Sequence, residues 1–282
     1  MEGLVSILYV VATPIGNLED ITDRAKRILS EVDLIAAEDT RHTSKLLAHL
    51  NITTPITTYH DHSESTAGLK LVAQLKKGVS IALVSDAGTP LIADPGYRLV
   101  NHALEEGIEV VPIPGPSAFV TAMSIAGLPS DKFTFYGFLP VKAKAREDFL
   151  ANIVNETGTL VFYESPHRIV KTMAALERVF GQERLMVVAR ELTKTFEQVV
   201  RKTIGEIRQQ IDTGEIVVKG EFVLLLQGQQ HIESKLDERK LLELLMAELP
   251  LSKAAEITSR LTGQGKNDLY KMALDIKNHS AE

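Results

Sequence analysis

The sequence predicts an α/β fold with two α/β domains, an N-terminal one with a parallel sheet and a C-terminal one with a mixed sheet, plus a small C-terminal helical extension. The 282 residues are enough for two domains that each bury a core. Short apolar runs alternate with longer helical patterns up to about residue 112, as in strands that are joined by crossover helices. From Glu233 onwards only helical patterns follow.

The N-terminal domain, expected at residues 1–115, alternates strands with helices. We expect strands at 6–13, 33–39, 55–60, 79–86 and 108–115, and helices at 21–30, 43–50, 65–76 and 94–106. Asp20 or Thr22 would cap the first helix, and Gly78 follows the third.

Pro and Gly are dense between residues 112 and 140, which predicts a hinge between the domains. For the C-terminal domain, at 116–230, we expect strands at 131–139, 157–165, 184–191 and 221–228, and helices at 168–180 and 204–211. Its β content is more hairpin-like than that of the first half, so its sheet should be mixed.

The extension, at 231–282, contains three helical patterns, at 236–249, 252–262 and 267–276. Ser252 and Asn267 are the expected N-caps of the second and third. Three short helices with a tight Gly-Gln-Gly turn have the outline of a helix-turn-helix. A bundle that only packs against the body or a partner subunit is equally compatible, because the segment has no excess of basic residues.

Composition bounds the function. Hydrophobic residues make up 44% and charged residues 24%, which is ordinary for a folded protein and excludes a disordered or fibrous one. Cysteine is absent, so neither a disulfide framework nor a thiolate metal site is expected, and a cytoplasmic location is the default. The apolar N-terminus runs into Pro14 and Gly16, which favours a core strand over a signal peptide. The net charge of −6 restricts any nucleic-acid contact to local basic patches.

Four loops at the carboxyl ends of expected strands are rich in small residues and proline: 13–18 (TPIGNL), 85–90 (SDAGTP), 112–118 (PIPGPSA) and 164–168 (ESPHR). Open α/β sheets place their ligands at such ends. Small residues let a ligand approach the backbone, and prolines hold that backbone in place. One such loop is more often an ordinary turn, but four in register favour a ligand site.

Other ligands have no matching motif. No loop has the phosphate-binding or dinucleotide-binding glycine pattern, so nucleoside triphosphates and nicotinamide cofactors are not indicated. His60 and His62 share a strand face in the run YHDHSE, but a metal ion would need a third ligand from elsewhere. We therefore expect a polar rim of a site there, and no metal.

Together the motifs ATPIGNLEDIT, AAEDTRHT, SDAGTPLIADPG, PIPGPSA, GFLP, ESPHRI and ARELTK, in this order and spacing, resemble the tetrapyrrole methylase superfamily, in its branch that methylates ribosomal RNA. The resemblance covers the whole chain. It implies two α/β domains, S-adenosylmethionine bound in the cleft between them, and a homodimer. It further implies 2′-O-methylation of a cytidine ribose in 16S rRNA, at the decoding site of the small ribosomal subunit. Tetrapyrrole-acting relatives have a short G-x-G-D first loop, whereas this chain has TPIGNL, which places its substrate outside the porphyrin group.

Carried over position by position, the resemblance gives a set of cofactor contacts: Pro14, Asp86, Ala87, Gly88, Thr89, Pro90, Ser117, Ala118, Tyr163, Glu164, Glu191, Gly220 and Glu221. Methyl transfer to a hydroxyl is an in-line displacement that needs alignment and a base. Polar residues near the strand ends are the candidates for that base: Asp20, Glu38, Asp39, His60, Glu64 and Asp86. Each of them is also a plausible helix cap or loop hydrogen-bond partner. Three residues are expected to hold RNA phosphates, with solvation at the surface as the alternative: Arg41, His167 and Arg168.

Two further functions stay open from the sequence. The first is a methylase of a small tetrapyrrole-like metabolite, which would use the same fold and cofactor. The second is a non-catalytic RNA-binding assembly protein that keeps the cleft as a scaffold, since a fold alone does not establish an activity.

Overall fold

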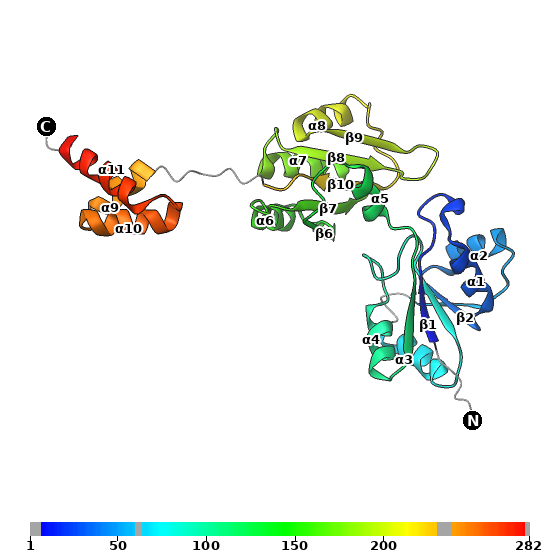
Figure 1. The fold of residues 1–282 in the computed structure, drawn as a ribbon. Coiled ribbons are helices and arrows are strands. Elements are labelled where there is room, and N and C mark those ends of the chain that lie inside the picture. Colours follow the sequence, from blue (N-terminus) through cyan, green and yellow to red (C-terminus); the bar gives the residue numbers. More distant parts are fainter. Residues whose placement is uncertain (1–6, 60–63, 230–237, 280–282) are drawn as a thin grey trace. The chain divides into compact units, whose positions relative to one another are not determined.

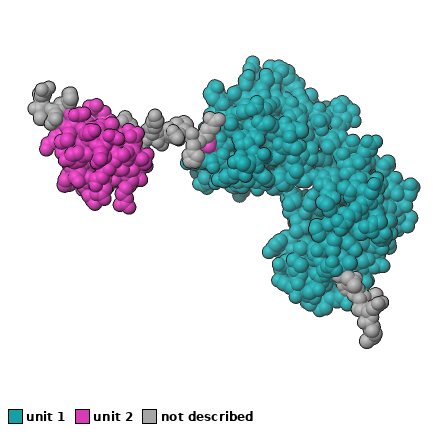
Figure 2. Space-filling model, in the orientation of Figure 1, with its two compact units in different colours: residues 1–228 teal, residues 229–282 magenta. Residues whose placement is uncertain are grey.

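The computed structural model describes residues 7–59, 64–229 and 238–279. The chain forms two compact units, Met1–Gly228 and Gln229–Glu282 (Figure 2). The first unit contains both sheets, and the second is helical. In the part of the chain that is described, no helix combines the length and the apolar character that crossing a membrane would require.

The first sheet is parallel throughout and has the strand order β3-β2-β4-β1-β5 (Figure 1). Its strands are β1 (Ile7–Val11), β2 (Leu34–Ala37), β3 (Ile56–Thr58), β4 (Ile81–Val84) and β5 (Glu109–Ile113). Between them run α1 (Asp23–Glu31), α2 (Thr40–His49), α3 (Glu64–Leu75) and α4 (Tyr97–Glu105). The expected alternation of strands and crossover helices is confirmed.

Two separate cores show which helix covers which face of this sheet. Ile28 of α1 and Leu47 of α2 share one core, and Leu75 of α3 and Leu99 of α4 share the other. The chain therefore leaves β1 toward one face and leaves β4, its neighbour, toward the opposite face. Adjacent strands whose connections diverge in this way create a crevice at their carboxyl ends, where α/β sheets bind ligands.

The second sheet is mixed, as expected, with the order β6-β7-β10-β8-β9. Its strands are β6 (Phe133–Phe138), β7 (Thr159–Glu164), β8 (Leu185–Arg190), β9 (Gln198–Thr203) and β10 (Phe222–Leu226). Only β6 and β7 pair in parallel; the three other pairs are antiparallel. All five residues of the central strand β10 are buried, as an apolar FVLLL run between two covered faces requires.

Helices cover both faces of the second sheet (Figure 1). On one face lie α6 (Ala143–Asn152), α7 (Ile169–Phe180) and α8 (Ile204–Asp212), which share one core. On the other lies α5 (Ala118–Ile125), whose buried Ala122 packs with Val223 and with Ile15 from the first loop of the chain. The loop after β1 thus contributes directly to the core of the second sheet.

The segment 112–140, predicted as a hinge, contains the expected strand β6 and also the helix α5, which was not expected. The run AFVTAMSI has neither Pro nor Gly, and the punctuated stretches on either side of it obscure its helical character. Two further elements were not expected, α6 and the edge strand β9. In β9 the sequence QVVRKT is mostly polar, as a strand with one neighbour and a solvent face allows. The domain boundary expected at residue 115 stays a prediction.

Helix starts correct several expected caps. The Thr22 hydroxyl, not Asp20, caps α1, by accepting the Ala25 amide at 3.1 Å. Helix α2 begins three residues earlier than expected, since Asp39 caps it. Helix α4 begins three residues after Asp94, following Gly96 at φ 136.

The second unit consists of α9 (Glu238–Met246), α10 (Leu251–Thr262) and α11 (Lys266–His279) around a small core of Leu242, Ala254, Ala255, Leu269, Ala273 and Ile276. Gly263 ends α10 in the left-handed conformation, at φ 74. Ser252 and Asn267, the expected N-caps, both lie inside their helices instead, and the residue before α10 is Pro250.

Candidate functional site

The loops after β1 and β4 are hydrogen-bonded to each other at the crevice between these strands. The Thr13 amide donates to the Gly88 carbonyl at 2.8 Å, and the Gly88 amide donates back to the Thr13 carbonyl at 3.0 Å. The Thr89 hydroxyl donates to the Pro116 carbonyl at 3.1 Å, which attaches the loop after β5. Three of the four loops predicted to carry a ligand are therefore joined to one another.

Gly88 is needed at the centre of this arrangement. Its φ of +81° lies in the left-handed region, and a Cβ there would come within 3.3 Å of Ile15 Cγ2 and 3.7 Å of the Pro116 carbonyl oxygen. A residue with a side chain would thus be strained and crowded at once.

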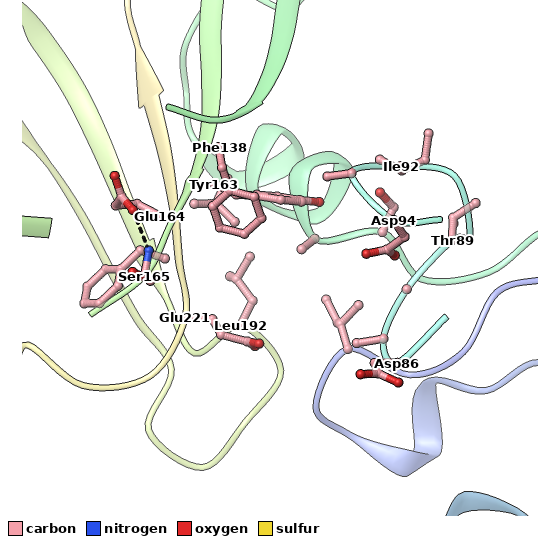
Figure 3. A pocket seen from close by; sticks show the side chains of 18 of the residues that line it. Asp86, Thr89, Ile92, Asp94, Phe138, Tyr163, Glu164, Ser165, Leu192 and Glu221 are labelled. Carbon is pink, nitrogen blue, oxygen red and sulfur yellow. Dashed lines mark hydrogen bonds between the residues drawn. The ribbon is translucent and has the colours of Figure 1, made fainter. Parts of the chain in front are cut away.

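A pocket of about 350 Å³ opens beside these loops, within the size range of small-ligand sites. Residues around both sheets line it: Ile15, Glu38, Asp86, Ala87, Gly88, Thr89, Ile92, Ala93, Asp94, Ser117, Ala118, Phe138, Tyr163, Glu164, Ser165, Pro166, Ala189, Leu192, Glu221, Phe222 and Val223. In Figure 3, Asp86, Thr89 and Asp94 lie on one side of the pocket, and Tyr163, Leu192 and Glu221 on the other.

One wall of the pocket is aromatic. Phe138 meets Tyr163 edge-on, with ring centroids 5.8 Å apart, and Phe135 meets the same ring at 4.8 Å. The Tyr163 hydroxyl accepts the Phe119 amide at 3.2 Å. Burial raises the pKa of Tyr163 above its ordinary value of 10.0, so the wall stays uncharged.

Five carboxylates belong to the lining, from both sides of the pocket: Glu38, Asp86, Asp94, Glu164 and Glu221. Asp86 Oδ1 accepts the Asp39 amide at 3.0 Å, which holds the side chain at the end of β4. The pocket therefore suits a ligand that carries both a positive charge and an aromatic ring.

Glu164 differs from the other carboxylates because its side chain is fully buried. It accepts the Thr172 hydroxyl at 2.6 Å and the Ser165 amide at 2.8 Å, and Arg168 Nε lies 3.2 Å from its Oε1. This carboxylate is therefore used mainly to fix the start of α7.

Lys194, in the loop after β8, links two carboxylates. Its Nζ lies 2.8 Å from both Glu191 Oε1 and Glu221 Oε2. Its aliphatic stem lies against Gly16, where any Cβ would overlap it. The loop after β8 and the loop after β1 are thus packed together beside the pocket.

The charges of this group reinforce each other. Burial alone would raise the pKa of Glu191, but the hydrogen bonds from Lys194 and the Glu221 amide lower it below 4.5. Burial likewise opposes the charge of Lys194, but its hydrogen bonds to Glu191 and Glu221 raise its pKa above 10.5. Both groups are charged near neutral pH.

Nine of the expected cofactor residues line the pocket: Asp86, Ala87, Gly88, Thr89, Ser117, Ala118, Tyr163, Glu164 and Glu221. Four others do not belong to the lining: Pro14, Pro90, Glu191 and Gly220. The side chain of Glu191 packs instead on Gly220, whose φ is +81°.

Sequence reasoning missed Asp94, Phe138 and Leu192 as lining residues, although each lies in a motif already singled out, SDAGTPLIADPG, GFLP or ARELTK. The motifs themselves were the signal that could have led to these three residues.

Of the residues expected to supply a base, the structure brings Glu38 and Asp86 into the pocket. Asp39 caps α2 and pairs with Arg41 at 2.6 Å, and this hydrogen bond lowers the pKa of Asp39. Asp20 ends the short 3₁₀ helix η1 (Leu18–Asp20), with Oδ2 buried. His60 lies outside the described residues, and Glu64 begins α3, with its side chain outside the description.

The three residues expected to hold RNA phosphates lie in different surroundings. Arg41 is exposed and paired with Asp39, and His167 is exposed. Arg168 instead turns inward to Glu164 and the Leu139 carbonyl. Their contact with RNA stays a prediction.

A metal centre finds no support in the described ranges, which hold no group of three His, Cys, Asp or Glu side chains that could bind an ion. The His60 and His62 run falls in the gap between them.

Comparison with known sequences decides the family. The profile of the Tetrapyrrole (Corrin/Porphyrin) Methylases matches residues 7–208, which span both sheets up to β10. This chain belongs to the tetrapyrrole methylase family. A second profile, the RsmI C-terminal HTH domain, matches residues 233–277.

Among the tetrapyrrole methylases with known sequences, close relatives align over nearly the whole chain. A protein of Pasteurella multocida (strain Pm70) named Ribosomal RNA small subunit methyltransferase I is 50% identical, over 98% of this chain and 99% of its own length. A protein of the same name from Escherichia coli O157:H7 is 52% identical, over 95% of this chain and 94% of its own length.

Solved structures of other tetrapyrrole methylases share the fold. A cobalt precorrin-4 methyltransferase superposes with a TM-score of 0.61 at 16% identity, covering 80% of this chain and 97% of its own. The uroporphyrin-III C-methyltransferase of Thermus thermophilus, complexed with S-adenosylhomocysteine, gives 0.55 at 18% identity, covering 78% and 96%. At these identities the likeness establishes the two-domain fold.

Proposed function

We propose that this protein transfers the methyl group of S-adenosylmethionine to the ribose 2′-oxygen of a cytidine in the 16S rRNA of the small ribosomal subunit. The observation that carries the proposal is the alignment at about 50% identity with small-subunit rRNA methyltransferases over 98% of the chain, the C-terminal unit included. The tetrapyrrole-acting structures cover only 78–80% of the chain. A metabolite methylase of the same fold is thus the less supported alternative.

The pocket fits the cofactor. S-adenosylmethionine supplies a methyl group on a positively charged sulfonium, and the carboxylates of Asp86, Asp94 and Glu221 suit that charge. The loop at 86–90 would contact its methionine part, and Ser117 and Ala118 the sulfonium region. The chain around Tyr163 and Glu164, around Glu191, and around Gly220 and Glu221 would frame the adenosine.

The reaction needs an aligned acceptor and a base, because a ribose hydroxyl is a very weak acid. Among the expected bases whose side chains the structure describes, Glu38 and Asp86 line the pocket, and our proposal assigns the proton of the 2′-hydroxyl to one of them. Asp39 is excluded from this role in our proposal, since it caps α2 and pairs with Arg41.

The remaining properties follow from the same assignment. We expect the protein to act in the cytoplasm, where ribosomal subunits are assembled, and to form a homodimer. Arg41 and His167, both exposed, would contact RNA phosphates.

A methyl-transfer assay tests the proposal directly. Tritiated S-adenosylmethionine is supplied with intact small subunits, naked 16S rRNA or precorrin-like tetrapyrroles, and the labelled RNA is digested and analysed by mass spectrometry. We expect one cytidine to gain a ribose methyl, with subunits or rRNA as acceptor. Label on a tetrapyrrole, or on a base, would contradict the assigned acceptor; no transfer to any of the three would favour a non-catalytic RNA-binding protein.

A further inference from the structure

Phe138 lies in the pocket lining, yet 55% of its surface is exposed. A phenyl ring that only filled the core would be buried, as Phe162 of the same sheet is. Phe138 instead presents its ring at the mouth of the pocket, next to Tyr163 (Figure 3).

The backbone is built to turn this ring into the pocket. The pairing of β6 with β7 shifts register between Phe135 and Phe138, and Gly137 within this bulge has a φ of +64°. Bulges of this kind redirect the side chain that follows, and they are frequent next to active sites. The strand thus departs from its pleat at the one point where it reaches the pocket.

Two arginines then hold the three residues after Phe138. Arg168 Nη2 donates to the Leu139 carbonyl, and Arg146 Nη1 donates to the Pro140 and Val141 carbonyls at 3.4 and 3.3 Å. Arg146 is 5% exposed, and Arg168 lies beside the buried carboxylate of Glu164.

Burying guanidinium groups costs free energy unless they are paired and hydrogen-bonded. Here both guanidinium groups donate hydrogen bonds to consecutive backbone carbonyls of one loop. The consequence is a short backbone segment with little freedom, which fixes the direction of an exposed aromatic ring.

We propose that Phe138 is the platform on which the base of the acceptor nucleotide stacks, and that Arg168 and Arg146 are positioning residues for that ring. The inference rests on the proposed function. Bases of unpaired RNA are commonly bound by stacking on aromatic side chains, which accept any base face. The enclosed part of the pocket is bounded by buried residues such as Ala189 and Val223, whereas the Phe138 ring faces the solvent side from which a large substrate arrives.

The test separates the two nucleobases of the reaction, the acceptor base and the cofactor adenine. Phe138→Leu keeps an apolar side chain but removes the flat ring, and Phe138→Tyr keeps the ring. With Phe138→Leu we expect the KM for the RNA acceptor to rise roughly 5- to 150-fold, the equivalent of about 1–3 kcal/mol of stacking. Phe138→Tyr should stay within about twofold of the native protein, and the Kd for S-adenosylmethionine, measured by calorimetry, should be unchanged in both, which also shows that both variants are folded.

Val141→Ala is the matched control, since Val141 is 76% exposed on the same loop and outside the pocket lining. An unchanged KM in Phe138→Leu, or the same change in Val141→Ala, would overturn the platform. A raised Kd for the cofactor with an unchanged KM for RNA would overturn it too, and would assign the ring to the adenine. These outcomes all presuppose that the native protein methylates RNA; failure there would instead refute the proposed function.

The positioning role has its own test. If Arg168 acts through Phe138, Arg168→Lys should raise the KM for RNA while sparing the Kd for the cofactor, and it should add little in a protein that already carries Phe138→Leu. Fully additive effects of the two substitutions would contradict this role for Arg168.

Discussion

Lys194 acts at the residue scale on three partners at once: two carboxylates through its ammonium group and the first loop through its stem. The sign of its pH dependence follows from the pKa shifts. Because the pKa of Glu191 is lowered from 4.5, its contribution to stability is present above that value and lost as the pH falls through the folded-state pKa. Because the pKa of Lys194 is raised from 10.5, its contribution is present below that value and lost as the pH rises through the folded-state pKa.

Replacing this lysine should therefore have an effect that acid removes. We expect Lys194→Met to lower the stability by about 1 kcal/mol at pH 7, a fall in Tm of roughly 2–4 °C, and to weaken cofactor binding. Since acid already discharges Glu191, the difference in Tm between the variant and the native protein should shrink below pH 4.5. Scanning calorimetry at pH 7 and pH 3.5 measures the two Tm differences, and titration calorimetry at pH 7 measures the affinity for the cofactor.

Lys77→Met, at an exposed position in the turn after α3, is the control and should change neither Tm nor affinity. A Tm difference for Lys194→Met that is the same at both pH values would contradict the ionic explanation.

The sequence predicts which polar residues lie near the strand ends, but it does not predict where their side chains point. Six residues were possible bases from the sequence, and a shift of one or two positions in a strand end decides which of them faces a cleft. Asp39 and Asp86 illustrate the problem, since both follow buried strands, yet the first caps a helix and the second lines the pocket. A cap is a local property that the sequence shows, whereas a pocket requires the other domain.

At the scale of elements, the four small-residue loops were the strongest sequence signal, and the structure joins three of them by hydrogen bonds. The alternation of strand and helix was predictable because crossover helices have long, regular apolar patterns. Strand β9 was not predictable, because this mostly polar segment becomes extended only through its pairing with β8. Helix α5 was hidden for another reason, the prolines and glycines that flank it.

Gly88→Val is the element-scale prediction. A valine at φ +81° is strained by about 1–2 kcal/mol and would press on Ile15 at the point where the two loops meet. We expect the variant to fold with a lowered Tm and to lose at least about tenfold in affinity for S-adenosylmethionine, measured by calorimetry.

Gly107→Val is the control that separates the effect of backbone strain from the effect of a side chain in the cofactor site. Gly107 has a similar φ of +71°, but nothing lies within 4 Å of a Cβ there. It should lose a comparable amount of stability and keep its affinity for the cofactor. Equal affinities in the two variants would remove Gly88 from the cofactor site.

At the scale of the whole molecule, the two compact units predict separate roles, cofactor binding for the first and recognition of the RNA acceptor for the second. The first unit holds every residue of the pocket, and the second has its own small core. A chain that ends at residue 228 should therefore fold and bind S-adenosylmethionine with native affinity, while its methylation of the RNA acceptor is weakened, which calorimetry and the tritium assay measure.

If the shortened chain is folded by circular dichroism but no longer binds the cofactor, the second unit is a structural part of the pocket. If it methylates RNA as well as the full chain does, the helical unit has no role in recognising that substrate.

The order of strands in the second sheet has a consequence for how the protein is made. Strand β10 comes last in the sequence of this sheet but lies in its middle, between β7 and β8. A nascent chain on the ribosome can complete the parallel sheet once residue 113 has emerged, because its five strands are then all present. The other sheet has to wait for residue 226, with the apolar edges of β7 and β8 uncovered meanwhile. We therefore expect synthesis to pass through a stage in which the parallel sheet is complete while the mixed sheet is still open and prone to aggregation.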